Sequence, residues 1–531
     1  MLQAGRPRSE VQDRNEPMRP AVLTASEAVA LIRDGDDLTT SGFVGIGVPE
    51  ALLAAIETSF LTTGHPRNLG LVFAAGQGDG KDRGLNHLGH RGLLRRVVGG
   101  HFGLIPRICD LALEGAIEAW NLPQGCISQS YRDAAARRPG MLTKVGLDTF
   151  VDPRLGGGAL NAASTDPLVT LHESDEDAWL WYAAPPINVA LLRGSTADAA
   201  GNISMEREAL LLDNLPQAMA ARNAGGRVIV QVEALESTRR VPGREVHLPG
   251  ALVDAVVVAP PEQHMQTFAT PFFEGFANRV RVPVPDELGG PLDARKVIAR
   301  RCAMELPRGG LVNLGIGMPE GVTAAASEAG LLHEVSLTAE PGVIGGRPGT
   351  GLDFGAAVNA DAVLPQHAQF DLYDGGGLDL AILGMAQVDA EGNVNVSRFG
   401  GRLAGAGGFI NISQAAKALV FAGTFTAGGL EIRVQDGRVS IDREGKRRKF
   451  LRHVEEITFA GTRARRLGQP VVYVTERCVF RLTSAGLRLV EVAPGIDVEH
   501  DILAHMAFRP IINDPTPMDA RLFRPEPLHL T

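Results

Sequence analysis

The chain has few aromatic residues, few cysteines and no excess of positive charge. Phe, Trp and Tyr make up 5% of the 531 residues, and the four cysteines lie far apart without forming a CxxC pair. Isolated cysteines of this kind fit a reducing compartment in which thiols stay unpaired. The formal net charge of −9 argues against a nucleic-acid-binding protein, which would normally present a basic face.

The sequence also lacks the apolar run of about 20 residues that a membrane-spanning helix requires. Residues 1–18 are polar and carry charges of both signs, so they are interpreted as a disordered tail rather than a signal peptide. These absences together predict a cytoplasmic protein with no membrane or nucleic-acid partner.

Glycine is abundant, and the chain is long. A chain of 531 residues with 44% hydrophobic content and 63 glycines exceeds one ordinary core and predicts two or more domains. Many glycines and few aromatics are common in α/β enzymes, where tight turns join strands to helices.

The chain repeats itself. The segment SGFVGIGVPEALLAAIE at 41–57 matches LVNLGIGMPEGVTAAASE at 311–328, and STADAAGNISM at 195–205 matches AQVDAEGNVNV at 386–396. The same order of motifs predicts two homologous halves that pack as a pseudo-dimer with a cleft between them. The two offsets differ, so the first half carries roughly 80 additional residues between its motifs.

A segment rich in proline and glycine, 268–293, separates the halves. The expected organisation is a disordered tail (1–18), an N-terminal half (19–275), a linker (276–292) and a C-terminal half (293–531). Strands alternate with helices in each half, which predicts an α/β fold with two open, mainly parallel sheets covered by helices on both faces. Ligands of such folds bind at the carboxyl ends of the strands.

Several glycine-rich motifs resemble nucleotide-binding signatures without matching them. In GIGVPE and GIGMPE, Glu50 and Glu320 replace the third glycine of the dinucleotide fingerprint, which favours a tight turn and a first helical turn over nicotinamide binding. The segment 75–84 lacks the Walker spacing, so it is either a plain loop or a rim that meets a phosphorylated ligand through Lys81.

Two charged clusters are also interpreted as structural features rather than as binding sites. His87, His90 and His101 lack carboxylate or cysteine partners at metal-ligand spacing, so no metal is expected. The basic run GKRRKF at 445–450 lies between two strand-like segments and is interpreted as a solvated hairpin tip, with an anion site as the alternative.

The segment SLTAEPGVIGG at 336–346 brings an apolar strand directly to a carboxylate. Glu340 is the first polar group after that strand, and a glycine turn follows it. Gly405, Gly407 and Gly408 form a second loop whose N–H groups could converge as an oxyanion hole, or could serve a simple chain reversal. Taken alone, Glu340 could cap a helix or form an interdomain salt bridge. A carboxylate beside oxyanion donors, however, is a nucleophile arrangement.

Together these segments resemble the family I coenzyme A transferases, in particular the single-chain acetate/propionate type. The resemblance covers about residues 22–525 and rests on GFVGIGVPE, NLPQGCISQSYRD, VGLDTFVDPR, NLGIGMPEG, TAEPGVIGG, GGGLDLAILG and GAGGFINISQAAK. It implies that the two halves correspond to the α and β subunits of heteromeric relatives. It also implies ping-pong transfer of CoA from a short-chain acyl-CoA to acetate or another short-chain acid, and a homo-oligomer (a tetramer or dimer).

The resemblance assigns roles to individual residues. Glu340 is implied to be the catalytic glutamate, which forms a glutamyl-CoA thioester, and the amides of Gly407 and Gly408 form the oxyanion hole. Gln124 matches a glutamine near the substrate carboxylate. Gly405 and Lys81 are the candidates for binding the CoA substrate, and no tightly bound cofactor is implied. Ala406 stands where close relatives are expected to have proline, which bears on the rigidity of the loop.

Two other functions remain open from the sequence. An acyl-CoA hydrolase would use the same glutamate but let water resolve the intermediate. A non-catalytic sensor of sugar phosphates or other metabolites could share the α/β architecture, but it would need neither Glu340 nor the GAGGF loop.

Overall fold

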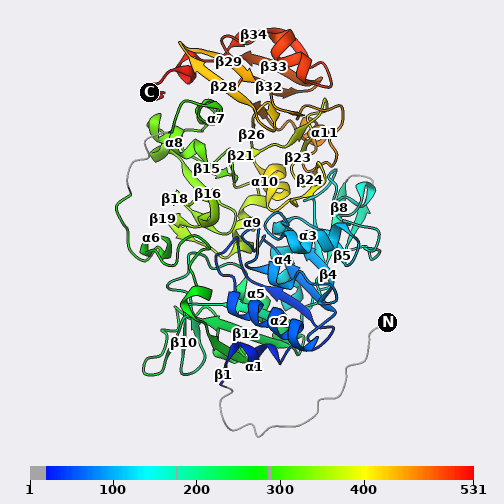
Figure 1. Cartoon of the computed structure of the whole chain (residues 1–531), viewed down its shortest axis with the longest axis vertical. Coiled ribbons are helices and arrows are strands. Elements are labelled where there is room, and N and C mark those ends of the chain that lie inside the picture. Colours follow the sequence, from blue (N-terminus) through cyan, green and yellow to red (C-terminus); the bar gives the residue numbers. More distant parts are fainter. Residues whose placement is uncertain (1–18, 175–176, 285–289, 531) are drawn as a thin grey trace.

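The computed structural model describes residues 19–174, 177–284 and 290–530. The expected tail at 1–18, and residues 285–289 of the expected linker, therefore lie outside the described residues. Two large sheets are built from strands of residues 21–258 and 311–517 respectively. Figure 1 shows them stacked along the long axis of the molecule, with α4, α9 and α10 near the level where they meet.

The first sheet has eight strands, and every neighbouring pair is parallel. In sheet order they are β1 (Ala21–Leu23), β14 (Ala255–Val258), β12 (Arg227–Val232), β9 (Val189–Arg193), β2 (Asp37–Thr40), β3 (Leu69–Phe73), β4 (Leu94–Gly99) and β5 (Glu118–Asn121). The helices of this region are α1 (Ala25–Val29), α2 (Glu50–Thr63), α3 (Pro106–Leu113), α4 (Gln124–Ala135) and α5 (Asn214–Asn223).

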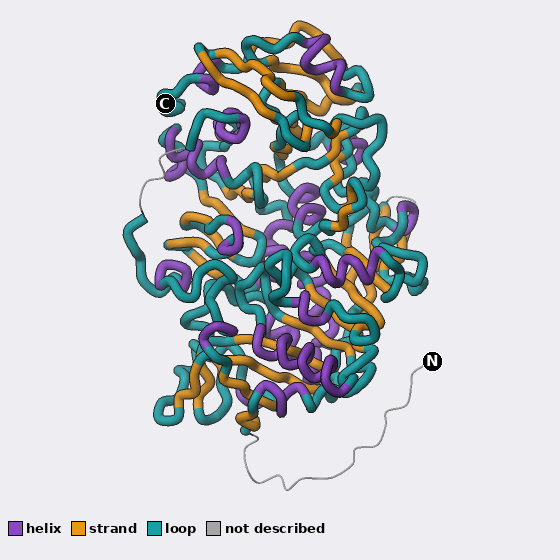
Figure 2. Tube along the Cα trace, viewed as in Figure 1, coloured by secondary structure: helices purple, strands orange, loops and turns teal. Residues whose placement is uncertain are grey.

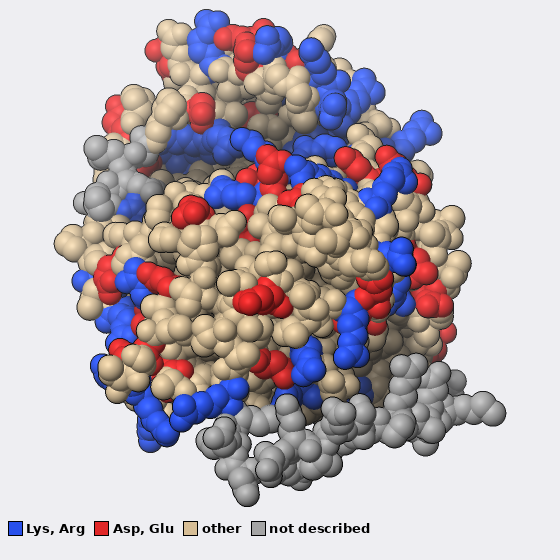
Figure 3. All heavy atoms as spheres, turned by 60° about the horizontal axis from the view of Figure 1, so that its bottom comes forward, with Lys and Arg blue, Asp and Glu red and all other residues tan. Residues whose placement is uncertain are grey.

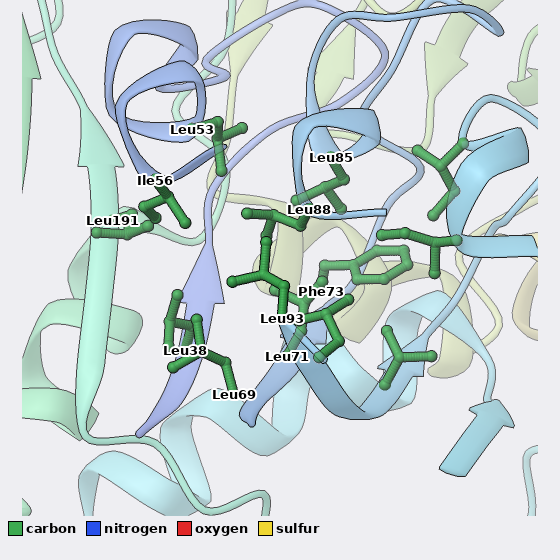
Figure 4. Packing of buried hydrophobic residues seen from close by; sticks show 14 of the residues in the cluster. Leu38, Leu53, Ile56, Leu69, Leu71, Phe73, Leu85, Leu88, Leu93 and Leu191 are labelled. Carbon is green, nitrogen blue, oxygen red and sulfur yellow. The ribbon is translucent and has the colours of Figure 1, made fainter. Parts of the chain in front are cut away.

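Both faces of this sheet are buried, which explains its continuous apolar strands. Leu71 and Phe73 of β3 pack on the side of α2, as Figure 4 shows, whereas Val72 points to the core under α4 and α5. The alternation follows from the two-residue period of a strand. The prediction of a parallel sheet with helices on both faces is confirmed for this sheet.

The second sheet has ten strands and is mixed. In sheet order they are β20 (Ala362–Val363), β17 (Val343–Ile344), β16 (Ser336–Ala339), β15 (Leu311–Leu314), β21 (Leu380–Gly384), β26 (Leu419–Ala422), β31 (Val471–Val474), β32 (Cys478–Thr483), β33 (Gly486–Val492) and β34 (Ile511–Pro517). The five from β16 to β31 are parallel, while β17, β20, β32 and β33 join by antiparallel pairing. The helices are α6 (Glu274–Ala277), α7 (Ala294–Ala303), α8 (Gly321–Glu328), α9 (Gln366–Asp374), α10 (Phe409–Ala415) and α11 (Gly461–Leu467).

Several small sheets lie beside the two large sheets (Figure 2). The stretch that is longer in the first half contains the antiparallel sheet of β6 (Gly140–Thr143), β8 (Ala178–Ala183) and β7 (Val169–Glu173). The others are β10 (Thr196–Asp198) with β11 (Ile203–Ser204) and β13 (Ala234–Glu236), β18 (Arg347–Pro348) with β19 (Ala357–Val358), β22 (Gln387–Val388) with β23 (Val394–Asn395), β24 (Arg398–Phe399) with β25 (Arg402–Leu403), β27 (Thr426–Ala427) with β30 (Arg447–Arg448), and β28 (Glu431–Gln435) with β29 (Arg438–Arg443).

The basic run at 445–450 is only partly solvated and does not form a hairpin tip: Lys446, Arg447 and Arg448 are exposed, but the end of the run is buried. Arg447 and Arg448 form β30, which pairs with β27, and Lys449 is only 7% exposed. Phe450 is fully buried and stacks on Phe425 with ring centroids 4.7 Å apart. The aromatic side chain anchors the end of the run in the core, which the charge pattern alone did not reveal.

The surface and the cysteines agree with the composition. Most of the face seen in Figure 3 is neither acidic nor basic; Lys and Arg gather in a hollow band below its uppermost part, and Asp and Glu form smaller groups elsewhere. All four cysteines are buried and unpaired, as predicted. Within the described ranges, every helix is too short or too polar to cross a membrane.

Candidate active site

Glu340 lies at the carboxyl end of β16, as its sequence context predicted. Leu337, Thr338 and Ala339 are buried, and the chain turns immediately after the carboxylate. The turn depends on Gly342, whose φ of +124° is a conformation that other residues rarely adopt, and a side chain there would collide with the Leu364 carbonyl oxygen at 2.0 Å. The strand therefore delivers Glu340 to the edge of the sheet at which ligands of α/β folds bind.

The environment of the Glu340 carboxylate is unusual. The side chain lies deep in the protein yet keeps some accessible surface, as expected of a group that faces an internal cavity. Burial raises its pKa to about 7, because the charged form loses hydration without gaining a partner. Within the described part of the chain, its carboxylate forms neither a hydrogen bond nor an ion pair, so it is available to react.

The second GIG motif lies beside Glu340 in the sheet. The register of β15 and β16 pairs Asn313 with Thr338, so Gly315 follows at the level of Glu340. Gly315 lines a cavity together with Glu320 and other residues of the turn and of the segment after β18. The cavity has a volume of about 20 Å³, and Glu340 is not part of its lining.

The glycine loop predicted as an oxyanion hole also lies at Glu340. A methyl group on Gly408 would be 3.2 Å from Glu340 Oε2, so the two residues are in direct contact. Gly407 has a φ of +54°, which glycine adopts without strain. The loop and Glu340 are neighbours, and their role as one catalytic site stays a prediction.

The loop is held by the first half of the chain. The Gly407 N–H donates to the carbonyl oxygen of Gly100 at 2.7 Å, and the Gln124 N–H donates to the carbonyl oxygen of Gly407 at 2.9 Å. The Ala406 N–H donates to Asn121 Oδ1 at 2.9 Å. Proline has no N–H and could not make this last bond, so alanine at 406 ties the loop to the first half rather than loosening it.

These bonds distinguish the two predicted oxyanion donors. The amide of Gly407 is already used by Gly100, whereas the amide of Gly408 is left without an acceptor in the described part of the chain. Gly405 lies farther back, where its N–H donates to Ser397 and a side chain would lie 2.9 Å from the Gly100 carbonyl oxygen. Gly408 is thus the better-placed donor, and Gly405 shapes the loop.

Gln124 reaches the same site from the first half. It is the first residue of α4, is 1% exposed, and its Nε2 donates to Gln366 Oε1 at 3.2 Å. Gln366, the first residue of α9, donates in turn to Asp213 Oδ2 at 2.7 Å. The Gln124 Oε1 atom lies 3.7 Å from where a methyl group on Gly407 would be. Gln124 therefore faces the glycine loop, while its place near the substrate carboxylate stays a prediction.

Lys81 is not part of this cluster. It is exposed, and its main-chain N–H donates to Asp79 Oδ1 at 2.9 Å. The loop that carries it folds over the first GIG motif, where the Gly84 N–H donates to Glu50 Oε2 at 2.9 Å. The loop thus closes the first motif, while the corresponding turn of the second remains open, with Ile316 52% exposed.

Two of the three histidines considered as metal ligands, His87 and His90, have carboxylate partners. His87 lies between Glu50 and Glu57, and His90 binds Glu57 with its Nε2 at 2.6 Å. No group of three or more metal-ligating side chains occurs in the described ranges. These histidines and carboxylates therefore form an ion-pair network.

Known proteins are similar to this chain over most of its length. The family profile described as coenzyme A transferase matches residues 22–259. The caffeate CoA-transferase of Acetobacterium woodii is 44% identical over 508 residues, which cover 94% of this chain and 97% of that protein. The chain belongs to the coenzyme A transferase family.

Two further comparisons extend this result to the fold of the transferase. The acetate CoA-transferase YdiF of Escherichia coli K12 is 41% identical over 508 residues, covering 95% of each chain. The crystal structure of acyl-CoA transferase YdiF from E. coli O157:H7, a thioester complex with CoA, superposes with a TM-score of 0.91 at 40% identity, covering 97% and 98% of the two chains. The predicted family, the α/β fold and the enzymatic nature of the protein are confirmed.

Sequence reasoning missed the residues that join the halves of the transferase at this site. Asn411 of α10 accepts from the Gly125 N–H at 3.1 Å and donates to Asp374 at 3.0 Å. Burial raises the pKa of Asp374 to about 6. Asn121 and Asn411 both lie inside segments that carry the family resemblance, so their place in those motifs was the available signal.

Proposed function

We propose that this transferase moves coenzyme A from a short-chain acyl-CoA to acetate or another short-chain acid, with Glu340 as the nucleophile. The observation that carries the proposal is the position of the Glu340 carboxylate, which has no partner in the described chain and touches Gly408 at the boundary of the two halves. Relatives that transfer CoA to acetate and caffeate support the same class of reaction.

The first half-reaction begins with attack on the thioester. A Glu340 oxygen bonds to the acyl carbonyl carbon, and the tetrahedral intermediate expels CoA thiolate to leave an acyl-glutamyl anhydride. The thiolate then attacks the glutamyl carbonyl carbon, which forms the Glu340–CoA thioester and releases the donor acid. The acceptor acid repeats these steps in reverse and leaves as its own CoA ester.

The environment of Glu340 suits this attack. With a pKa of about 7, Glu340 is ionised in close to half of the molecules at neutral pH, and its attack needs no general base. A carboxylate with little hydration and no counter-ion is a better nucleophile than one in water. The Gly408 N–H can stabilise the oxyanion, and one such donor contributes roughly 2.7–4 kcal/mol in acyl transfer.

Binding energy from the parts of CoA distant from the thioester supplies the remaining stabilisation of the transition state. Contacts with the pantetheine and nucleotide can offset the desolvation of the reacting groups, so that they lower the barrier rather than only the KM. The open GIGMPE turn beside Gly315 provides the approach, since the first copy of the motif is closed by its own loop.

The test is the mass of the protein after incubation with acetyl-CoA or propionyl-CoA. A covalent CoA adduct, mapped to Glu340 by borohydride reduction and peptide analysis, is expected. Its absence from folded protein with several acyl-CoAs would refute the proposal. Adding acetate then separates transfer from hydrolysis, because a transferase makes new acetyl-CoA and a hydrolase makes only free thiol.

A further inference from the structure

His101 is a second side chain at this site that has no partner. It follows β4, directly after Gly100, whose carbonyl oxygen holds the Gly407 amide. Neither of its ring nitrogens forms a hydrogen bond or ion pair in the described part of the chain. The side chain lies deep in the protein but keeps accessible surface, the same combination found at Glu340.

Glycines make room for the imidazole on several sides. A methyl group on Gly76 would lie 2.5 Å from His101 Nδ1, and one on Gly103 would lie 3.0 Å from Cε1 and 3.3 Å from Nε2. A methyl group on Gly407 would lie 3.7 Å from Cδ2. These glycines come from both halves of the chain, and the absence of their side chains leaves space for the imidazole ring.

The glycine loop connects His101 with Glu340. A methyl group on Gly407 would contact the imidazole, and one on Gly408, the next residue, would contact the carboxylate, so the loop lies between the two side chains. The same Gly407 faces Gln124 Oε1. His101 and Gln124 therefore meet one side of the loop from the first half, while Glu340 meets it from the second.

The charge of the site restricts what these side chains can do. Burial lowers the pKa of His101 to about 4, so the ring is neutral, with one N–H donor and one acceptor nitrogen. Burial is also the cause of the raised pKa of Glu340, which shows that no cation of the described chain offsets its charge. A cation there would pair with Glu340 and weaken it as a nucleophile.

We propose that His101 is a substrate-binding residue, whose imidazole N–H holds the carboxylate of the short-chain acid opposite Glu340. This inference rests on the proposed function. Once Glu340 carries CoA as a thioester its charge is gone, and the acid becomes the only anion in the site. The neutral imidazole N–H can bind the acid at this stage. Before the thioester forms, the neutral ring does not hold the free Glu340 carboxylate in an ion pair.

The experiment compares three replacements of His101 in the full-length enzyme. His101→Phe fills the space without a donor, His101→Gln restores an N–H, and His101→Ala leaves a gap. Two quantities are measured: the rate of glutamyl-CoA formation from acetyl-CoA alone, and the KM for acetate or propionate as acceptor. His172→Ala, an exposed histidine of β7, is the control.

We expect His101→Phe to raise the acceptor KM at least tenfold, because a hydrogen bond to a charged group is lost. His101→Gln should stay within a few-fold of the parent enzyme, and glutamyl-CoA formation should change little in either variant. If the phenylalanine variant does not fold, the alanine variant provides the same comparison with glutamine.

The inference is overturned if the donor-less and glutamine variants behave alike, whether both resemble the parent or both are equally impaired, since packing alone would then explain His101. The two proposals fail in different ways. Parent enzyme that never forms a Glu340–CoA adduct refutes the proposed function, whereas normal adduct formation with an unchanged acceptor KM in His101→Phe refutes only the role of His101.

Discussion

The main-chain amide of Gly407 donates a hydrogen bond to the carbonyl oxygen of Gly100 across 2.7 Å. The two residues lie in different halves of the chain, and the bond joins the loop beside Glu340 to the end of strand β4. It also removes one of two candidate donors from the oxyanion hole, which leaves Gly408 next to the proposed nucleophile.

The pH dependence of the reaction should report Glu340. Because burial raises its pKa to about 7 and only the ionised form attacks, kcat/KM for acetyl-CoA is expected to rise about tenfold per pH unit below that value and to level off above it. The dissociation constant of free CoA, measured at the same pH values, is the control. A pH profile of kcat/KM with its midpoint near the ordinary glutamate pKa would contradict the burial of the Glu340 carboxylate.

Stability should show the opposite trend with pH. The pKa of Glu340 rises on folding from 4.5 to about 7, so ionisation costs the folded state more than the unfolded state. The parent enzyme therefore loses stability as pH rises through this window, whereas Glu340→Gln does not. The variant should gain nothing near pH 4 and at most on the order of 3 kcal/mol above about pH 7.

Chemical denaturation at both pH values measures this difference. Glu340→Gln should also lack transferase activity while remaining folded. An equal effect of the substitution on unfolding free energy at low and high pH would show that the carboxylate is solvated or paired in solution.

Replacing Gly408 by alanine should impair the chemistry more than the fold. Its φ of −78° is acceptable to alanine, but the new methyl group would lie 3.2 Å from the Cδ and Oε2 atoms of Glu340 and from Ile412 Cδ1. Displacing the carboxylate by a few tenths of an ångström should lower kcat/KM at least tenfold, because attack depends on the alignment of the reacting atoms.

The matched control for this change is Gly243→Ala, which adds a methyl group where nothing lies within 4 Å. It should leave both activity and melting temperature unchanged. Rapid-quench measurement of glutamyl-CoA formation distinguishes slower chemistry from weaker binding, and parental rates in Gly408→Ala would argue against close contact during the reaction.

Ala406→Pro should destabilise the loop that relatives are expected to build with proline. The substitution deletes the N–H that binds Asn121 Oδ1 and leaves a buried acceptor unpaired, at a cost of about 1–3 kcal/mol. The cost should shrink when Asn121→Ala is already present, as a double-mutant cycle would show. If the stability costs of Ala406→Pro and Asn121→Ala simply add in the double variant, the hydrogen bond between these two residues contributes nothing to stability.

Local patterns in the sequence predicted the parts of the site that one segment can specify. The apolar run before Glu340 and the glycines after it define a strand and a turn, and the repeated GIG motifs indicated two related halves. Pairings between distant segments, such as Gln124 with Gln366 or Asn121 with Ala406, left no local signal because each depends on how the halves pack.

Two features had no signal along the chain. The sequence pattern assigned no role to His101 beyond rejecting it as a metal ligand, since spacing along the chain says nothing about the glycines that surround it in space. The buried Lys449 was assigned to a hairpin tip because neighbouring charges dominate the pattern, although Phe450 anchors that segment in the core.

The loop at 405–408 and its acceptors near residues 100–124 belong to one polypeptide. Their encounter is therefore intramolecular and does not depend on the concentration of the protein. A handful of main-chain bonds suffices to keep them together under that condition. If the chain were cut between α6 and α7, the same bonds would have to support association of two separate molecules, and activity would become dependent on dilution.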